Sequence, residues 1–109
     1  MAKNQLVTPY DDNGFPAVAA FTTPIAAGSS TTTVKASPGR LCRVVVTTAG
    51  TSTDNITIYD NATAGSGEVL AVIPGGGTVG TIYALDLPAV NGITVVNVAS
   101  GPAVTIGWS

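Results

Sequence analysis

The sequence predicts an all-β protein: a single antiparallel β-sandwich or jelly-roll-like domain of about seven to eight strands, with an extended N-terminal arm. Abundant Thr and Val, together with 13 glycines and 7 prolines, are typical of strands separated by turns. Turn signals recur about every ten residues, as in sandwiches and barrels. No helical period is present, because the most helix-like stretch, FPAVAAF at 15–21, is short and lies between two prolines. A chain of 109 residues forms one domain.

The first part of the chain predicts an arm (1–30) that precedes the sandwich domain (31–109). Little alternates in this segment, and three prolines interrupt it: Pro9, Pro16 and Pro24. Such a segment buries little of its own surface. We therefore expect it to lie along the domain or on a neighbouring subunit, with one added strand near AAFTTPI (19–25). The alternative is a disordered tail.

Seven strands are predicted after the arm, each bounded by turn residues. In chain order they are TTTVKA (31–36), LCRVVVTT (41–48), ITIYD (56–60), EVLAVI (68–73), VGTIYALDL (79–87), ITVVNVA (93–99) and AVTIGWS (103–109). The signals that end the first six are SPG (37–39), AGTSTDN (49–55), NATAGSG (61–67), PGGG (74–77), Pro88 with the turn dipeptide Asn91-Gly92, and SGP (100–102).

Two of these strands are apolar on both faces. In EVLAVI one face carries Val69, Ala71 and Ile73, while Leu70 and Val72 occupy the other. In LCRVVVTT one face carries Cys42, Val44 and Val46, and the other carries Leu41 and Val45. A sandwich strand with one solvated face should alternate. Either the arm folds over these strands in a tight double sheet, or another subunit covers their second face.

The last strand alternates well. Val104, Ile106 and Trp108 share one face, and Thr105 and Gly107 share the other. We expect Trp108 to hold this strand in the core, with a surface anchor for a partner as the alternative.

Residues that usually carry chemistry are missing. The chain has no histidine, which removes the common general base, the Ser-His-Asp and Cys-His arrangements and most zinc sites. The glycine-rich PGGGTVG (74–80) lacks the lysine and the following helix of a phosphate-binding loop, so it is interpreted as an inter-strand loop. Cys42 is the single cysteine, which excludes an intrachain disulfide and favours a small buried apolar residue. We expect no cofactor and no enzymatic activity.

Three of the acids lie within DNITIYDNATAGSGEVLAVI (54–73): Asp54, Asp60 and Glu68. A facing pair of carboxylates would suit a glycosidase, and loop carboxylates suit calcium. However, Asp54 and Asp60 each stand beside an asparagine at the two ends of a predicted strand, which is turn chemistry. Asp86 lies between Leu85 and Leu87 and should face away from them. No calcium-loop spacing is present, so we expect neither catalytic nor metal-binding residues, and each acid at a turn or on a solvated face.

Tyr59 is the aromatic residue beside a polar loop. It shares a strand face with Thr57, opposite Ile56 and Ile58. An exposed Tyr59 would favour a small glycan-binding, lectin-like module with weak affinity. The alternative is a tyrosine that packs on the sheet.

Charge and hydropathy limit the partners. Four cations, Lys3, Lys35, Arg40 and Arg43, are too few for strong nucleic-acid binding. No apolar run approaches the roughly 18 residues of a membrane helix, and the N-terminus has no apolar signal core, which predicts retention in the cytosol. Charged residues make up only 9% of the chain, against about 25% in typical domains. A surface this poor in charge indicates extensive contact with other protein.

These features together are typical of a repeated structural subunit. Few charges allow copies to lie close together, and an arm can pair with a neighbour strand to strand. We expect intersubunit contacts from six residues of the arm: Lys3, Leu6, Val7, Tyr10, Phe15 and Phe21.

Several segments also resemble the small head-associated structural proteins of tailed bacteriophages. The segments are GRLCRVVVTTAGT (39–51), ITIYDN (56–61), AGSGEVLAVIP (64–74) and YALDLPAVNGITVVNVASGPAVTIGWS (83–109). The resemblance runs from about Val34 to Ser109, roughly the last two-thirds of the chain. It implies a short β-sandwich or jelly roll of the decoration, or cement, type.

The resemblance also implies a function. A decoration protein binds the outer face of the assembled head shell and staples neighbouring capsid subunits, so the expected partners are the major capsid protein and other copies of this chain. The expected location is the capsid exterior of the virion, assembled in the host cytoplasm. The alternatives are a tail, neck or fibre-base component and, from a different class, the glycan-binding module.

Overall fold

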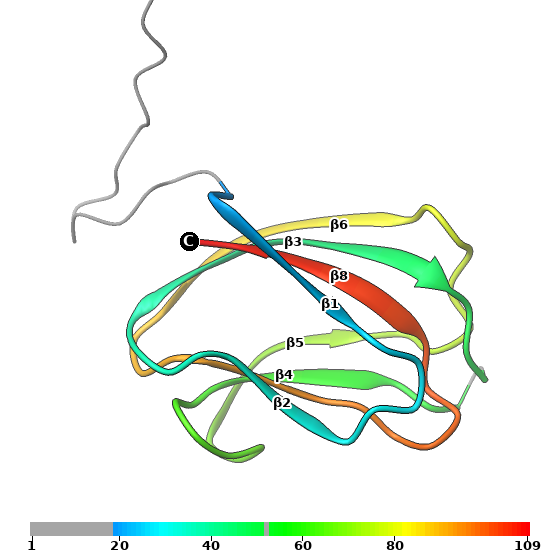
Figure 1. The fold of residues 1–109 in the computed structure, drawn as a ribbon, viewed down its shortest axis with the longest axis horizontal. Helices are drawn as coiled ribbons and strands as arrows, with labels where there is room; N and C mark the ends of the chain where they lie inside the picture. Colours follow the sequence, from blue (N-terminus) through cyan, green and yellow to red (C-terminus); the bar gives the residue numbers. More distant parts are fainter. Residues whose placement is uncertain (1–18, 52) are drawn as a thin grey trace, which may run out of the picture.

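The computed structural model describes residues 19–51 and 53–109, and these form two four-stranded antiparallel sheets (Figure 1). Sheet 1 has the order β1-β8-β3-β6 and sheet 2 the order β2-β7-β4-β5. The predicted all-β sandwich is confirmed. The strands are β1 (Phe21–Ile25), β2 (Thr31–Lys35), β3 (Gly39–Thr48), β4 (Ile56–Asp60), β5 (Glu68–Ile73), β6 (Ile82–Ala89), β7 (Ile93–Val96) and β8 (Ala103–Trp108). The part of the chain that the structure describes contains no helix long and apolar enough to span a lipid bilayer.

The strands pair as one long hairpin that is folded across both sheets. β1 pairs with β8 and β3 with β6 in sheet 1, while β2 pairs with β7 and β4 with β5 in sheet 2. Successive hairpin levels therefore alternate between the sheets, with additional pairing of β3 with β8 and of β4 with β7. This nested order is that of a double-sheet jelly roll. The sequence leaves open whether the domain is a plain sandwich or a jelly roll, and the strand order identifies a jelly roll.

The connections between successive strands lie at two opposite ends of the sandwich (Figure 1). The loop end consists of the four connections 26–30, 49–55, 74–81 and 97–102, of which residue 52 is not described. The terminal end consists of the connections 36–38, 61–67 and 90–92, together with residues 19–20 and 109. The start of β1 and the end of β8 lie side by side at the terminal end, because Phe21 is paired with Trp108.

The core fills the space between the sheets with aliphatic side chains from all the strands except β2. Its members are Ile25, Leu41, Val44, Val46, Ile56, Ile58, Ile73, Ala89, Ile93, Val95, Val104 and Ile106. Val34 of β2, Trp108 and others pack against it. Val104, Ile106 and Trp108 thus share the inner face of β8, and the prediction that Trp108 holds the last strand in the core is confirmed.

A β-bulge explains the mixed faces of LCRVVVTT. The register of β3 shifts between Leu41 and Arg43 against both neighbouring strands. Against β8, Cys42 is the additional residue of a bulge, and it places Leu41 on the same face as Val44 and Val46, so that all three enter the core. The prediction that Cys42 shares a face with Val44 and Val46 is therefore wrong.

A second bulge explains EVLAVI. The pairing of β4 with β5 moves from Ile58 opposite Ala71 to Tyr59 opposite Val69, which leaves Leu70 as the additional residue. Leu70, Ala71 and Ile73 consequently pack on the core. Val72 remains on the outside, 52% exposed. The strand therefore has one buried face. Its pattern can be explained without an arm folded over the second face and without another subunit covering it.

β1 lies inside segment 1–30, at the place of the added strand expected near AAFTTPI. It is an edge strand, and Pro24 is tolerated there because an edge strand is paired on one side only. Of the arm residues predicted to make intersubunit contacts, Phe21 begins β1. The other five, Lys3, Leu6, Val7, Tyr10 and Phe15, lie outside the described residues.

Candidate functional site

Asp60 lies at the end of β4 and is buried, with only 6% of its surface exposed. Its carboxylate accepts three backbone hydrogen bonds from the β6–β7 connection. Oδ2 accepts from Val90 N at 2.9 Å, and Oδ1 accepts from Asn91 N at 2.7 Å and from Gly92 N at 3.2 Å. Burial alone would raise the pKa of this carboxyl group, but the three N–H donors hold the pKa below its usual value. Asp60 therefore acts as an ionised clamp between the two sheets.

Turn chemistry is what the sequence predicts for Asp60, and its hydrogen bonds to loop amides agree with that prediction. The sequence places it at a turn, and it does satisfy backbone groups, but those of a connection some 30 residues further along the chain. The turn dipeptide Asn91-Gly92 predicts the β6–β7 connection, but not that this connection binds Asp60. The partnership itself depends on β4 and β6 ending at the same end of the sandwich.

The other described acids are separate from this clamp. Glu68 is exposed and lies opposite Asp60 in the β4–β5 register, while Asp54 is half-buried at the loop end. Asp86 is exposed, as predicted, and pairs with Arg40 at 3.2 Å; the same Arg40 Nη1 also donates to the Asp86 carbonyl oxygen at 3.0 Å. Asp86 has a φ of 53°, a left-handed conformation opposite the β3 bulge. Within 19–51 and 53–109, no group of three or more Asp, Glu or Cys residues is arranged to hold a metal ion.

Tyr59 lies on the outer face of sheet 2, as its alternation predicts, but it is half-buried. The β4–β5 connection folds back beneath this face (Figure 1). Asn61 holds its shape by accepting hydrogen bonds from Thr63 N and Ala64 N at 2.9 and 2.8 Å, and by donating to the Ser66 carbonyl oxygen. Gly65 consequently lies against Val96 and the Tyr59 ring. The tyrosine packs on its sheet and is not presented as an open platform for a sugar.

Cys42 is buried in the β3 bulge, as the sequence predicts. Burial raises the pKa of its thiol, and the charge of Asp86 acts in the same direction, while a hydrogen bond with Ser109 and the two nearby arginines partly offset the effect. A thiol of raised pKa in a buried position is a poor nucleophile.

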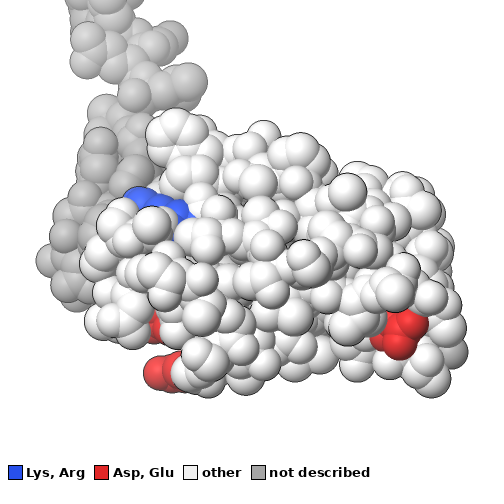
Figure 2. All heavy atoms as spheres, turned by 60° about the horizontal axis from the view of Figure 1, so that its bottom comes forward, with Lys and Arg blue, Asp and Glu red and all other residues white. Residues whose placement is uncertain are grey.

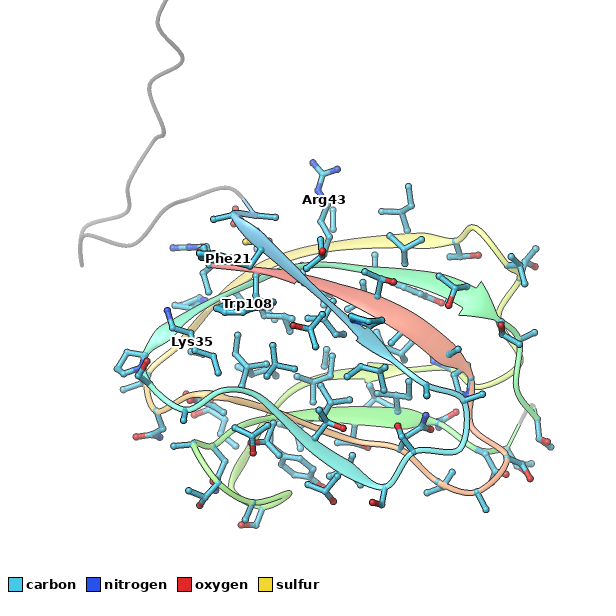
Figure 3. All side chains as sticks on the ribbon, viewed as in Figure 1. Phe21, Lys35, Arg43 and Trp108 are labelled. Carbon is cyan, nitrogen blue, oxygen red and sulfur yellow. The ribbon has the colours of Figure 1, made fainter. Side chains whose placement is uncertain are left out.

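Aromatic residues gather at the terminal end (Figure 3). The rings of Phe21 and Trp108 stack with centroids 4.8 Å apart, and Lys35 Nζ lies 5.6 Å from the centroid of the Trp108 ring. Trp108 Nε1 donates a 2.9 Å hydrogen bond to Thr23 Oγ1. Trp108 thus joins the beginning of β1 to the body of the sandwich. Phe21 remains 58% exposed beside it.

The charges are distributed unevenly over the surface. Five of the described charged residues, Lys35, Arg40, Asp60, Glu68 and Asp86, lie at or near the terminal end. Arg43 points away from the outer face of sheet 1 (Figure 3). In the described part of the loop end, Asp54 is the only charged side chain. On the face that Figure 2 shows, charged atoms occupy small separate areas and most of the surface is uncharged.

The loop end combines this lack of charge with exposed apolar side chains and fixed backbone. Val79, 58% exposed, and Val98 project there. The connections are bonded to one another: Gly50 N donates to Gly75 O at 2.8 Å, Thr51 N to Ser100 O at 2.8 Å, and Asn97 N to Ser30 O at 2.7 Å. Asn97 Nδ2 also donates to the carbonyl oxygens of Ala26 and Pro102. The loop end is therefore the candidate interaction surface of the domain.

Comparison with known proteins identifies no relative. No family model matches the chain, and no curated protein and no solved structure matches it either.

Proposed function

We propose that this chain is a non-enzymatic structural protein of a bacteriophage virion, a decoration protein that binds the outer face of the head shell and staples neighbouring capsid subunits. The observation that carries the proposal is the loop end of the jelly roll, which is nearly uncharged, exposes Val79 and Val98, and has connections that are hydrogen-bonded to one another. Jelly rolls recur in viral capsid proteins. The sequence resemblance described above points to the same class.

The loop end suits a protein partner for two physical reasons. A surface without charges loses little hydration free energy when it is covered, because charged groups are the costly ones to desolvate. Connections that are already bonded to one another lose little conformational entropy on binding. A specific contact buries about 800 Å² per partner, and repetition over a lattice adds avidity without further contacts.

The exposed valines of the nearly uncharged loop end predict a sharp mutational test. Val79→Asp introduces a charge into the proposed interface and should weaken binding to capsids by at least about tenfold, because an unpaired buried charge is strongly unfavourable. Val72→Asp is the matched control, since Val72 has similar exposure (52% against 58%) but lies on the outer face of sheet 2. Co-sedimentation with shells lacking the protein measures both. Equal loss in the two variants would place the interface elsewhere.

Residues of the arm form the second part of the proposal, through pairing with a neighbouring subunit. Deletion of residues 2–18 should abolish capsid binding and leave a folded domain. The deletion ends before Ala19 because Ala20 N donates a hydrogen bond to Trp108 O at 2.9 Å and extends the β1–β8 pairing. Unchanged capsid binding by the folded truncated chain would refute this part alone.

The proposal as a whole is tested by the copy number in purified particles, measured by quantitative mass spectrometry. Hundreds of copies in fixed ratio to the major capsid protein are expected. A count of about six or twelve, the numbers of closed rings, would move the chain to the tail, neck or fibre base. Absence from particles would refute a virion role.

A glycan-binding module is the second candidate, since jelly rolls also form lectin domains. Its candidate contact from the sequence is Tyr59, which the β4–β5 connection half-covers, so the structure favours this function less than the first. Under this function Tyr59→Ala weakens binding on a glycan array and leaves particle assembly unchanged.

A further inference from the structure

The β6–β7 connection contains an Asn-Gly dipeptide, Asn91-Gly92, which is the sequence most prone to spontaneous deamidation. In that reaction the backbone nitrogen of the glycine loses its proton and attacks the side-chain amide carbon of the asparagine. Ammonia leaves, a cyclic succinimide forms, and one water molecule opens the ring to aspartate or isoaspartate. Water is the only co-reactant.

The structure presents one reactant and restrains the other. Asn91 is exposed, so water can reach its side chain and ammonia can leave, whereas Gly92 is buried. Gly92 N donates to Asp60 Oδ1 at 3.2 Å, and Asn91 N donates to the same oxygen at 2.7 Å. Loss of the Gly92 amide proton would end one of these bonds and set a new negative charge against the carboxylate, which opposes ionisation of the attacking nitrogen.

The backbone around Gly92 is restrained as well. A Cβ at this position would lie 2.6 Å from the Lys35 carbonyl oxygen and 2.8 Å from Ala62 Cα. Ring closure requires rotation about the bond between the Asn91 Cα and its carbonyl carbon, which carries the Gly92 nitrogen with it. That rotation would push Gly92 against two other segments of the terminal end.

We propose that Asn91 is a latent deamidation site, kept unreactive in the fold by the Asp60 carboxylate that holds the Gly92 amide. Deamidation then proceeds only from states in which the 90–92 connection has left Asp60. The reaction makes that opening irreversible, because the product carboxylate at position 91 repels Asp60, and an isoaspartate lengthens the backbone of a connection that is bonded at three successive amides.

Incubation of the full chain at mildly alkaline pH, with and without denaturing urea, tests the proposal. Peptide mapping with isoaspartate detection should show Asn91 reacting at least about a hundredfold more slowly in the native chain than in the unfolded chain, because the native reaction has to await local opening. Equal rates in the two states would overturn the proposal.

Variants then separate the carboxylate from the surrounding packing. Asp60→Ala should raise the native rate at Asn91 by at least about tenfold, and Asp60→Asn, which keeps the shape and loses the charge, should give an intermediate rate. Glu68→Gln is the matched control, since it removes one charge from the residue opposite Asp60 and touches none of the three amides. A folded Asp60→Asn with the wild-type rate would show that packing alone protects, and would remove Asp60 from the proposal.

Hydrogen exchange provides a measurement that needs no variant. The amides of Val90, Asn91 and Gly92 should exchange together, and their opening rate should follow the deamidation rate of Asn91 as sub-denaturing urea is added. Deamidation that stays constant while these amides open more often would contradict the proposal.

Discussion

Asp60 connects two separate parts of the fold through one side chain. One carboxylate satisfies three backbone N–H groups and joins sheet 2 to the connection that leaves sheet 1. Loss of these partners would be costly, above all for the N–H of the buried Gly92. The side chain therefore replaces strand pairing at the place where the chain crosses between sheets.

Removing this carboxylate should destabilise the fold. Asp60→Ala leaves three backbone donors unpaired, and we expect the free energy of unfolding to fall by about 3 kcal/mol. Asp60→Asn should cost less, because the amide oxygen still accepts. Urea denaturation at neutral pH measures both, and a loss no larger than that of Glu68→Ala would contradict the clamp.

The lowered pKa of Asp60 also predicts a pH dependence. Because the pKa of the folded state lies below that of the unfolded state, the contribution of Asp60 is fully present above the unfolded value of 3.8. It should decrease as the pH falls through the folded-state pKa, where the carboxylate takes up a proton. Asp60→Asn should remove this part of the acid dependence, as measured by urea midpoints between neutral and strongly acidic pH. An identical pH profile for the variant would contradict the assignment.

The burial of Cys42 predicts that its thiol reacts slowly. Burial raises its pKa and limits access, so reaction with a disulfide reagent at neutral pH should be at least roughly tenfold slower in the folded chain than in urea. A native rate equal to the unfolded rate would show that the bulge opens readily. The sequence predicts this burial correctly, since a lone cysteine in an apolar run is usually internal.

At the scale of elements, the strand positions are predictable and the bulges are not. Turn residues such as Ser37-Pro38-Gly39 and the polar run at 61–67 place the strand ends close to where they occur. By contrast, Cys42 and Leu70 are ordinary apolar residues, and only the pairing of β3 with β8 and of β5 with β4 makes them additional residues of a bulge. A period-2 pattern applied across a bulge assigns one side of it to the wrong face.

β1 is held to the sandwich by Trp108, and this predicts coupled mutations. Trp108→Ala should lower the free energy of unfolding by about 3 kcal/mol, and Phe21→Ala by about 1 kcal/mol because Phe21 is largely exposed. The double variant should show a coupling of about 1 kcal/mol from the lost ring stack.

The control for this cycle is Ile82→Ala combined with Trp108→Ala. Ile82 is about as exposed as Phe21 (59% against 58%) and belongs to the same sheet. However, Ile82 lies at the opposite end of that sheet from Phe21. These two changes should be additive. A Phe21–Trp108 pair that is equally additive would contradict the stacking contribution.

At the scale of the whole molecule, the nested pairing joins distant parts of the chain. Trp108 bonds to Thr23 across a separation of 85 residues. Such long-range contacts carry a large loop-closure entropy, so refolding from urea should take roughly milliseconds to seconds. Stopped-flow fluorescence of Trp108, the single tryptophan, follows the step directly, and a microsecond phase with full amplitude would contradict the expectation.

The same nesting could not be predicted from the sequence. Composition and turn spacing predict about seven or eight antiparallel strands, but each turn residue reports only that the chain reverses, and not which sheet the next strand joins. The uneven charge distribution was missed for the same reason. Lys35, Arg40 and Glu68 are scattered along the chain and lie at one end only after β2, β3 and β5 are placed.

The adjacency of β1 and β8 has a mechanical consequence. A load applied through the residues that precede Ala19 reaches the domain at the first pair of the β1–β8 ladder, Phe21 opposite Trp108. From there it would peel the edge strand away one bond at a time instead of shearing the whole ladder at once. The stacked rings of Phe21 and Trp108 and the hydrogen bond from Trp108 to Thr23 lie at the end of the ladder where the strands separate first. They would set the force at which the sandwich yields under tension.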